Sequence, residues 1–361
     1  MAKHRSNQPP IPVVAPATWS ALIAAAHDFG TLAPWTWMHD SQLLGLRDPV
    51  TGERLLCSIL GRLRTVYALL VFRRNTGCRW ILRTILDSEG SNEADAPDLD
   101  SGLDQDCVKV EFTAKSELSK NDLAVLAAAG IAPPAKRGPV WPAFSSLLPG
   151  TYPWSLTQAE AETLLFALPR VTAFALLGRE HPDLSMDLLS EGVPFLNADF
   201  DPASRPLRLG DLDWEPPIPP PESPPPQVKL PEATLEGLLK LPQMQNFHLE
   251  LDVFYAPMAV TGKERPFFPK TVLAVDRNTQ LIVGMSMAEI TDLEAVAKVG
   301  EVLASALQQM NSRPETIRVL RPRVAQMIAP LTARLGIPVH LERKLAVLSE
   351  ARDAMMQRFQ R

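Results

Sequence analysis

A run of prolines constrains this chain more than any other feature. The segment PPIPPPESPPP at 216–226 has eight prolines in eleven residues. Proline fixes φ and has no amide proton, so the run enters neither a helix nor the middle of a sheet. It is typical of polyproline II, which rises about 3.1 Å per residue and so spans roughly 34 Å here. We therefore predict a stiff spacer at 213–229; a proline-rich ligand for a partner domain is the alternative.

The length of 361 residues also favours two domains, because single cores stop growing near about 250–300 residues. We expect a disordered tail at 1–16, an N-terminal α+β domain at 17–212 and a C-terminal domain at 230–361. No stretch of about 18 uninterrupted apolar residues occurs, which predicts no membrane span and no membrane partner. The proline-broken start MAKHRSNQPPIPVVAPATW lacks the apolar core of a signal peptide.

The cysteines and the charges indicate a cytoplasmic protein with one acidic loop. Cys57, Cys78 and Cys107 are odd in number and form no C-x-x-C pair, as expected for reduced thiols. Cys57 lies in an apolar strand and is interpreted as a buried, unreactive thiol. The formal charge of -5 arises from eight acids within 87–106, a segment without Lys or Arg. Such a composition predicts a mobile acidic loop, since it buries too little apolar surface to offset its ordering.

The N-terminal region has mixed helix and strand signals. Apolar residues from Trp19 recur at helical spacing up to Gly30, which we interpret as the helix stop. Ser119 or Asn121 is expected to cap the helix that ends at Gly130, and Thr157 is expected to cap another, where it forms a capping box with Glu160. The proline-bounded segment PVWPAFSSLLPGTYPWSL is expected to be irregular. The remaining expected elements are a hairpin at 42–61 around Gly52, a strand at 66–72, a helix at 77–86 and a strand at 107–112.

The C-terminal region has the most readable order of elements. Residues 246–341 pass from NFHLELDVFYAP through KTVLAVD and LIVGMSMAE to a helix, the strand ETIRVL, a second helix and PVHLE, and a last helix follows. This βββαβαβα order resembles the ribonuclease-H-like fold. The resemblance implies a central first strand that lies beside the antiparallel second strand and the parallel fourth. An intact domain of this kind would be a nuclease dependent on Mg²⁺ or Mn²⁺.

Several longer motifs resemble an uncharacterised bacterial two-domain family of unknown function. In the N-terminal region they are WSALIAAAHDFGTLAPWTWM, DPVTGERLLCSILG and WPAFSSLLPGTYPWSL. In the C-terminal region they are LELDVFYAPMAV and RPFFPKTVLAVDRNTQLIVG. The resemblance covers nearly the whole chain except the two linkers. It implies the division into two domains and no particular reaction.

The first strand of the C-terminal region carries the candidate site residues His248, Glu250 and Asp252. Alternation places these side chains on one face and the apolar residues from Phe247 to Tyr255 on the other. A polar row at a sheet centre has two explanations, which both stay open here. Carboxylates at this place hold divalent cations in two-metal nucleases. A sheet face that helices cover only in part would also leave the row in contact with water.

The other ligand positions argue against the metal site. The end of the fourth strand, where a nuclease places a second carboxylate, holds Arg321 and Arg323. A guanidinium there would repel cations instead of binding them. Glu294 is the alternative catalytic partner of Asp252, but Thr291 and Glu294 also form a capping box. Glu350 and Asp353 fall on the polar side of the last helix.

Residues 311–361 contain ten Lys or Arg and four acids. Arg318, Arg321 and Arg323 belong to this basic stretch, which suggests a nucleic-acid surface. A solvated helix face is the alternative, because no interleaved aromatic residues for base stacking accompany the charges.

The sequence carries no fingerprint of a nucleotide-binding, dinucleotide-binding, zincin or α/β-hydrolase site. We therefore expect a non-catalytic binding or scaffolding protein with a degenerate ribonuclease-H-like domain and no cofactor. The sequence does not identify its partner; a protein and, through the basic C-terminal region, a nucleic acid are the two candidates. The alternatives are a nuclease dependent on Mg²⁺ or Mn²⁺ and a nucleic-acid-binding protein.

Overall fold

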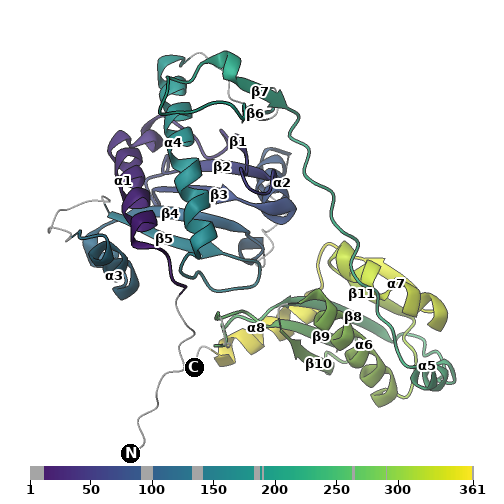
Figure 1. Cartoon of the computed structure of the whole chain (residues 1–361). Helices are drawn as coiled ribbons and strands as arrows, with labels where there is room; N and C mark the ends of the chain where they lie inside the picture. Colours follow the sequence, from purple (N-terminus) through teal and green to yellow (C-terminus); the bar gives the residue numbers. More distant parts are fainter. Residues whose placement is uncertain are drawn as a thin grey trace, which may run out of the picture. The chain divides into compact units, whose positions relative to one another are not determined.

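The computed structural model in Figure 1 describes residues 12–90, 101–131, 141–182, 188, 191–261, 265–289 and 291–359. The chain is α+β and forms two compact units, Pro10–Pro149 with Pro153–Pro221, and Gly150–Tyr152 with Glu222–Arg361. Most of the expected N-terminal tail and the centre of the expected acidic loop, 91–100, lie outside the described residues.

The N-terminal unit is built on a seven-stranded sheet with the order β5-β4-β3-β2-β1-β6-β7. Neighbouring strands are antiparallel except β1 and β6, which pair in parallel. The expected hairpin is formed by β1 and β2, and Gly52 in its turn has a φ of 71°. The strands are β1 Leu44–Arg47, β2 Arg54–Leu60, β3 Ala68–Phe72, β4 Cys107–Thr113, β5 Trp141–Leu147, β6 Val193–Leu196 and β7 Leu212–Glu215.

Helices cover both faces of this sheet (Figure 1). Helices α1 (Pro16–Leu32) and α4 (Gln158–Glu180) contribute to the main core on one face, and α2 (Arg74–Gly90) contributes to a second core on the other. Among the described residues, α4 is the one helix long and apolar enough to span a membrane. Its buried side chains, including Leu164, Leu168 and Phe174, belong to the main core, so packing accounts for its composition.

The capping signals identified the helix starts correctly. Ser119 accepts a hydrogen bond from the Asp122 amide at the start of α3 (Lys120–Ala128), which ends before Gly130. Thr157 accepts a hydrogen bond from the Glu160 amide at the start of α4. These bonds satisfy amides that a helix start leaves without a partner.

Two local predictions were wrong. Gly30 does not stop α1, which continues to Leu32 and ends at Ala33 in the left-handed region. A Cβ on Gly30 would lie 2.6 Å from the Phe112 ring, so close packing explains this glycine. The segment expected to be irregular contains β5, whose side chains alternate between partial and full burial. Pro142 is tolerated there because β5 is an edge strand and needs no amide bond on its free side.

The C-terminal unit has the expected order of strands and helices after a short helix α5 (Glu232–Leu239). Its five-stranded sheet has the order β10-β9-β8-β11-β12, with β8 at the centre. As expected, β8 pairs antiparallel with β9 and parallel with β11. The elements are β8 His248–Tyr255, β9 Lys270–Asp276, β10 Ile282–Ala288, α6 Asp292–Gln309, β11 Thr316–Val319, α7 Pro322–Leu335, β12 Val339–Leu341 and α8 Ala346–Phe359.

The two faces of this sheet differ in how much they are covered. Leu249 and Leu251 of β8 point into a large core with α6 and α7. On the other face, Phe254 and two β9 residues form a small cluster with α8. Helix α8 packs against β8 and β9 on this face. The apolar cluster under it is small, so the rest of the face is available to polar side chains.

Candidate functional site

His248, Glu250 and Asp252 lie on the α8 face at the centre of the second sheet. Leu249 and Leu251 alternate with them and belong to the opposite core, as the sequence pattern predicts. Glu250 and Asp252 are almost completely buried, with exposed fractions of 2% and 1%. A buried carboxylate needs a charged or hydrogen-bonding partner to offset its lost hydration. The partners of these groups therefore show what the row does.

Asp252 is paired with an arginine. Arg321 Nη1 lies 2.6 Å from Asp252 Oδ2 and also donates a hydrogen bond to the Val253 carbonyl oxygen. Arg321 immediately precedes α7, two residues after β11 ends at Val319. The parallel pairing of Val319 with Leu251 brings it to this point. A positive side chain thus lies against the central carboxylate of the sheet.

Glu250 caps a helix that follows 98 positions later in the sequence. Its Oε2 accepts a hydrogen bond of 2.8 Å from the Leu348 amide in the first turn of α8. Its Oε1 lies 3.9 Å from Arg277 Nε. A carboxylate at a helix start is stabilised by the free amides and by the helix dipole. Burial and charge of Glu250 are therefore explained by the docking of α8.

The remaining polar groups near the row also have local partners. His248 Nδ1 lies 2.9 Å from Thr316 Oγ1 on the neighbouring strand. Asp276 accepts hydrogen bonds from the Asn278 amide and the Thr279 hydroxyl in its own turn. Thr291 Oγ1 accepts a hydrogen bond from the Glu294 amide, which is one half of the predicted capping box, and the Thr291 hydroxyl donates to Glu294 Oε2 at 3.0 Å.

No metal-binding cluster forms within the part of the chain that the structure describes. There, no three His, Cys, Asp or Glu side chains are grouped so that they could hold an ion. Glu350 and Asp353 are exposed on α8, and Glu289 is exposed at the end of the β10 hairpin. Among the described side chains, the geometry brings Asp252 together with Arg321.

The arginines of the basic stretch form ion pairs within the unit. Arg318 Nη1 lies 2.5 Å from Glu342 Oε1, and Arg334 Nη2 lies 2.6 Å from Glu232 Oε1. Such pairing reduces the positive charge that a nucleic-acid phosphate would meet. Arg343 and Lys344 are exposed beside them.

Arg323 binds Asp292 and two residues inside the proline-rich segment. It donates to Glu222 Oε1 at 2.8 Å, to the Ser223 carbonyl oxygen at 3.0 Å and to Asp292 Oδ2 at 2.5 Å. Burial raises the pKa of Asp292, but Lys270 and Arg323 outweigh it and hold the pKa below its usual value. The sequence analysis did not identify Asp292 as a partner, because its role depends on groups far away in the chain.

Two family profiles match the chain. Residues 19–193 match a domain of unknown function, DUF7309, and residues 234–356 match a second domain of unknown function, DUF6930. The chain combines a DUF7309 domain with a DUF6930 domain. This agrees with the resemblance to an uncharacterised two-domain family. No curated protein and no solved structure matches the chain.

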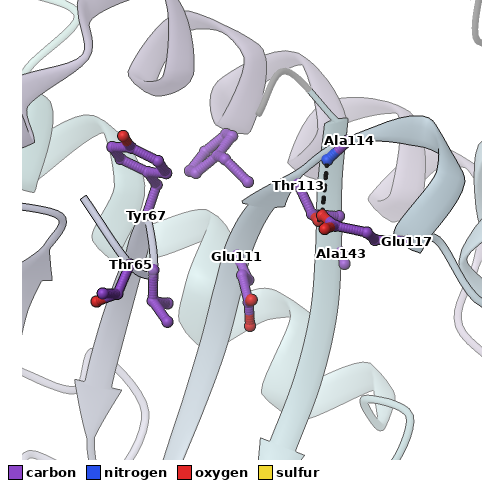
Figure 2. A pocket seen from close by; sticks show the side chains of 9 residues that line it. Thr65, Tyr67, Glu111, Thr113, Ala114, Glu117 and Ala143 are labelled. Carbon is purple, nitrogen blue, oxygen red and sulfur yellow. Dashed lines mark hydrogen bonds between the residues drawn. The ribbon is translucent and has the colours of Figure 1, made fainter. Parts of the chain in front are cut away.

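The DUF7309 domain contains an open cavity of about 510 Å³ at one end of β3, β4 and β5 (Figure 2). Glu111 and Glu117 are its charged lining residues, and Thr113 donates a hydrogen bond to Glu117. This bond and one from the Ala114 amide lower the pKa of Glu117. The sequence offered no signal for this cavity, because its lining comes from three separate segments. The remaining lining residues are Thr65, Val66, Tyr67, Phe112, Ala114 and Ala143.

A buried ion network lies elsewhere in the DUF7309 domain. Arg73 lies 2.8 Å from Glu160 Oε1 and 3.3 Å from Asp106 Oδ1. Arg74 binds both oxygens of Asp106 at 2.6 Å. Ser146 donates to Glu160 at 2.6 Å. The network ties the turn before α2 to β4, β5 and the start of α4, so its role is structural.

The cysteines of the DUF7309 domain offer no nucleophile. Cys57, Cys78 and Cys107 are buried free thiols. Burial raises the pKa of Cys78 and of Cys107 to about 12, and it also raises that of Cys57. The reactive form is the thiolate, so raised pKa values make these thiols inert at neutral pH.

Proposed function

We propose that the C-terminal domain, 230–361, is a degenerate ribonuclease-H-like domain and that the protein is a non-catalytic binding or scaffolding protein. The order of its elements supports this fold. So does the strand order β10-β9-β8-β11-β12, with β11 parallel to the central β8. The N-terminal domain, 17–212, and the spacer, 213–229, complete the proposed organisation. Residues 216–230 contain neither helix nor strand, in keeping with a spacer.

The ion pair of Asp252 and Arg321 carries the proposal. Two-metal nucleases hold their cations about 3.5–4 Å apart with several carboxylates. Here a fixed guanidinium lies 2.6 Å from the central carboxylate. Its charge opposes the binding of divalent cations at the same place. Glu250 caps α8, and Glu294 lies in the first turn of α6, where its amide donates a hydrogen bond to the cap residue Thr291.

The partner that fits this domain best is a protein. Arg318, Arg321 and Arg323, which suggested a nucleic-acid surface, each form an ion pair with an acid of the same unit. We also propose a cytoplasmic location, because three free cysteines are typical of proteins from reducing compartments.

A cleavage assay tests the proposal. Purified protein is incubated with single-stranded DNA, duplex DNA, RNA and an RNA–DNA hybrid in Mg²⁺ or Mn²⁺. We expect no cleavage above that of the Asp252→Asn variant, whose folding is checked by circular dichroism. Cation-dependent cleavage that the folded Asp252→Asn variant loses would overturn the proposal. Anisotropy with labelled nucleic acids at low salt tests the partner class, and we expect no salt-dependent binding.

A further inference from the structure

The edges of the two sheets differ in how they are protected. An exposed edge presents unpaired amides and carbonyls, and proteins protect it with short strands, charges, proline or covering segments. Strand β12 has three residues and is followed by Glu342, Arg343 and Lys344. Strand β7 has four residues, two of them acidic. Strand β5 contains Pro142, and Trp154 exchanges two backbone hydrogen bonds with Ser146.

Strand β10 is longer than β12 and β7, and the one protection that the structure describes for it is an irregularity in its pairing near Ile282. It is the outer strand of the second sheet, and β9 is its one strand partner among the described residues. Its sequence, IVGMSMA, contains no charged residue and no proline, and the preceding Leu281 is also apolar. The pairing with β9 shifts between Ile282 and Gly284, and the register is regular from Gly284 to Ala288. Five consecutive residues therefore present a regular, uncharged edge.

An apolar strip runs beside this edge on the α8 face of the sheet. Met285 pairs with Leu273, which pairs with Asp252, so these three side chains share one face. Leu273 is buried under α8, whereas Met285 is 52% and Met287 is 43% exposed. Ile282 and Leu281 are 45% and 63% exposed. Helix α8 therefore covers the centre of this face and leaves the strip along β10 open.

We propose that β10 pairs antiparallel with β10 of a second copy of this chain. A twofold axis through Ser286 would place Met285 opposite Met287 of the other copy, and Gly284 opposite Ala288. The four methionines would then form one cluster on a continuous sheet of ten strands. Methionine is flexible and polarisable, so it adapts to such a self-complementary contact.

The absence of charge in β10 favours a second copy over a different peptide. In a twofold antiparallel pair, residues near the axis lie opposite or diagonally close to their own copies, so charges there would repel each other. With no charged residue between Leu281 and Ala288, self-pairing meets no such repulsion. A twofold contact is also closed, so it ends with a dimer and does not lead to fibres. The inference does not depend on the proposed function.

Sedimentation of the whole chain tests the proposal. A strand edge is smaller than the roughly 800 Å² per partner of standard interfaces, so we expect a dimer that dissociates in the micromolar range. The variant Met285→Lys/Met287→Lys places four positive charges at the contact. We expect its dissociation constant to be at least about tenfold higher than that of wild type. The control Val50→Lys/Leu63→Lys changes two more exposed residues of the other unit and should dimerise like wild type. A wild-type monomer throughout the range, or a dimer unaffected by Met285→Lys/Met287→Lys, would overturn the proposal.

Hydrogen exchange distinguishes the possible occupants of the edge. We expect the β10 amides to become more protected as the protein concentration rises through the dissociation constant. Strong protection that does not change with concentration would mean that another segment of the same chain covers the edge. Lack of protection at every concentration would mean a free edge. Both results would contradict the pairing of two copies.

Discussion

Arg321 and Asp252 lie 69 positions apart in sequence and 2.6 Å apart in the structure. The carboxylate is fully buried, and the guanidinium is the positive group that faces it. Removing the arginine would leave a buried negative charge without a partner, and the free energy lost with its hydration would no longer be offset. The pair therefore stabilises the centre of the DUF6930 domain.

Replacing Arg321 by Met should destabilise the protein by about 3 kcal/mol, the low end for a broken buried pair, because the arginine is partly exposed. The double variant Arg321→Met/Asp252→Leu removes both charges and should recover most of this loss. Urea unfolding followed by circular dichroism measures both effects, because all seven tryptophans lie in the other domain. If the double variant loses the sum of the two single losses, the two residues are not coupled.

Replacing Glu250 by Ala should loosen the start of α8. The variant leaves the Leu348 amide without its acceptor, for an expected loss of about 1–3 kcal/mol. Hydrogen exchange should become faster in the first turn of α8. Glu250→Gln keeps an acceptor oxygen and removes the charge, so its effect should be smaller. Equal effects of both variants would show that the cap acts through charge alone.

Acid should destabilise the DUF7309 domain through Glu160. Burial raises the pKa of this carboxyl, but hydrogen bonds from Ser146 and the Thr157 amide, together with Arg73, outweigh burial and lower the pKa below 4.5. A lowered pKa in the folded state adds stability above the unfolded value, and this stability is lost as pH falls through the folded pKa.

Glu160→Gln should therefore be less stable than wild type at neutral pH. When the pH is lowered below 4.5, this variant should lose less stability than wild type does. Urea unfolding at a series of pH values measures the difference. Glu162→Gln, a more exposed change in the same helix, serves as the control. If the stability of Glu160→Gln depended on pH in the same way as that of wild type does, Glu160 would not be a source of the acid sensitivity.

Removing Arg323 should free Glu222 and Ser223, inside the proline-rich segment, from α7. Arg323→Ala loses the contacts with Glu222, Ser223 and Asp292, while Val228 keeps its hydrogen bond to the Met327 carbonyl. We expect cleavage after Glu222 by a glutamate-specific protease to become about five- to tenfold faster. Arg334→Ala removes a more exposed ion pair with Glu232 and should leave this cleavage rate unchanged. Equal cleavage rates in Arg323→Ala and wild type would show that the contacts do not hold the segment.

The sequence by itself determined the local features of this protein. Alternation along 247–255 predicted which face of β8 is polar, because successive side chains of a strand point to opposite sides. Ser119, Thr157 and Thr291 predicted three helix starts, because their hydroxyls bond amides within the same turn. The order of strands and helices in the C-terminal region followed from the same short-range patterns. Gly30 and β5 were misread because their environment, Phe112 and the neighbouring strand, comes from distant parts of the chain.

Only the tertiary structure decided what the polar side chains do. The sequence placed Arg321 near the end of β11, but the pairing of β11 with β8 decided that it binds Asp252. It left Glu250 as a candidate ligand, whereas the docking of α8 made it a helix cap. Periodicity specifies the face on which a side chain lies. The group that it meets there depends on packing between segments far apart in the chain, which no short-range pattern encodes.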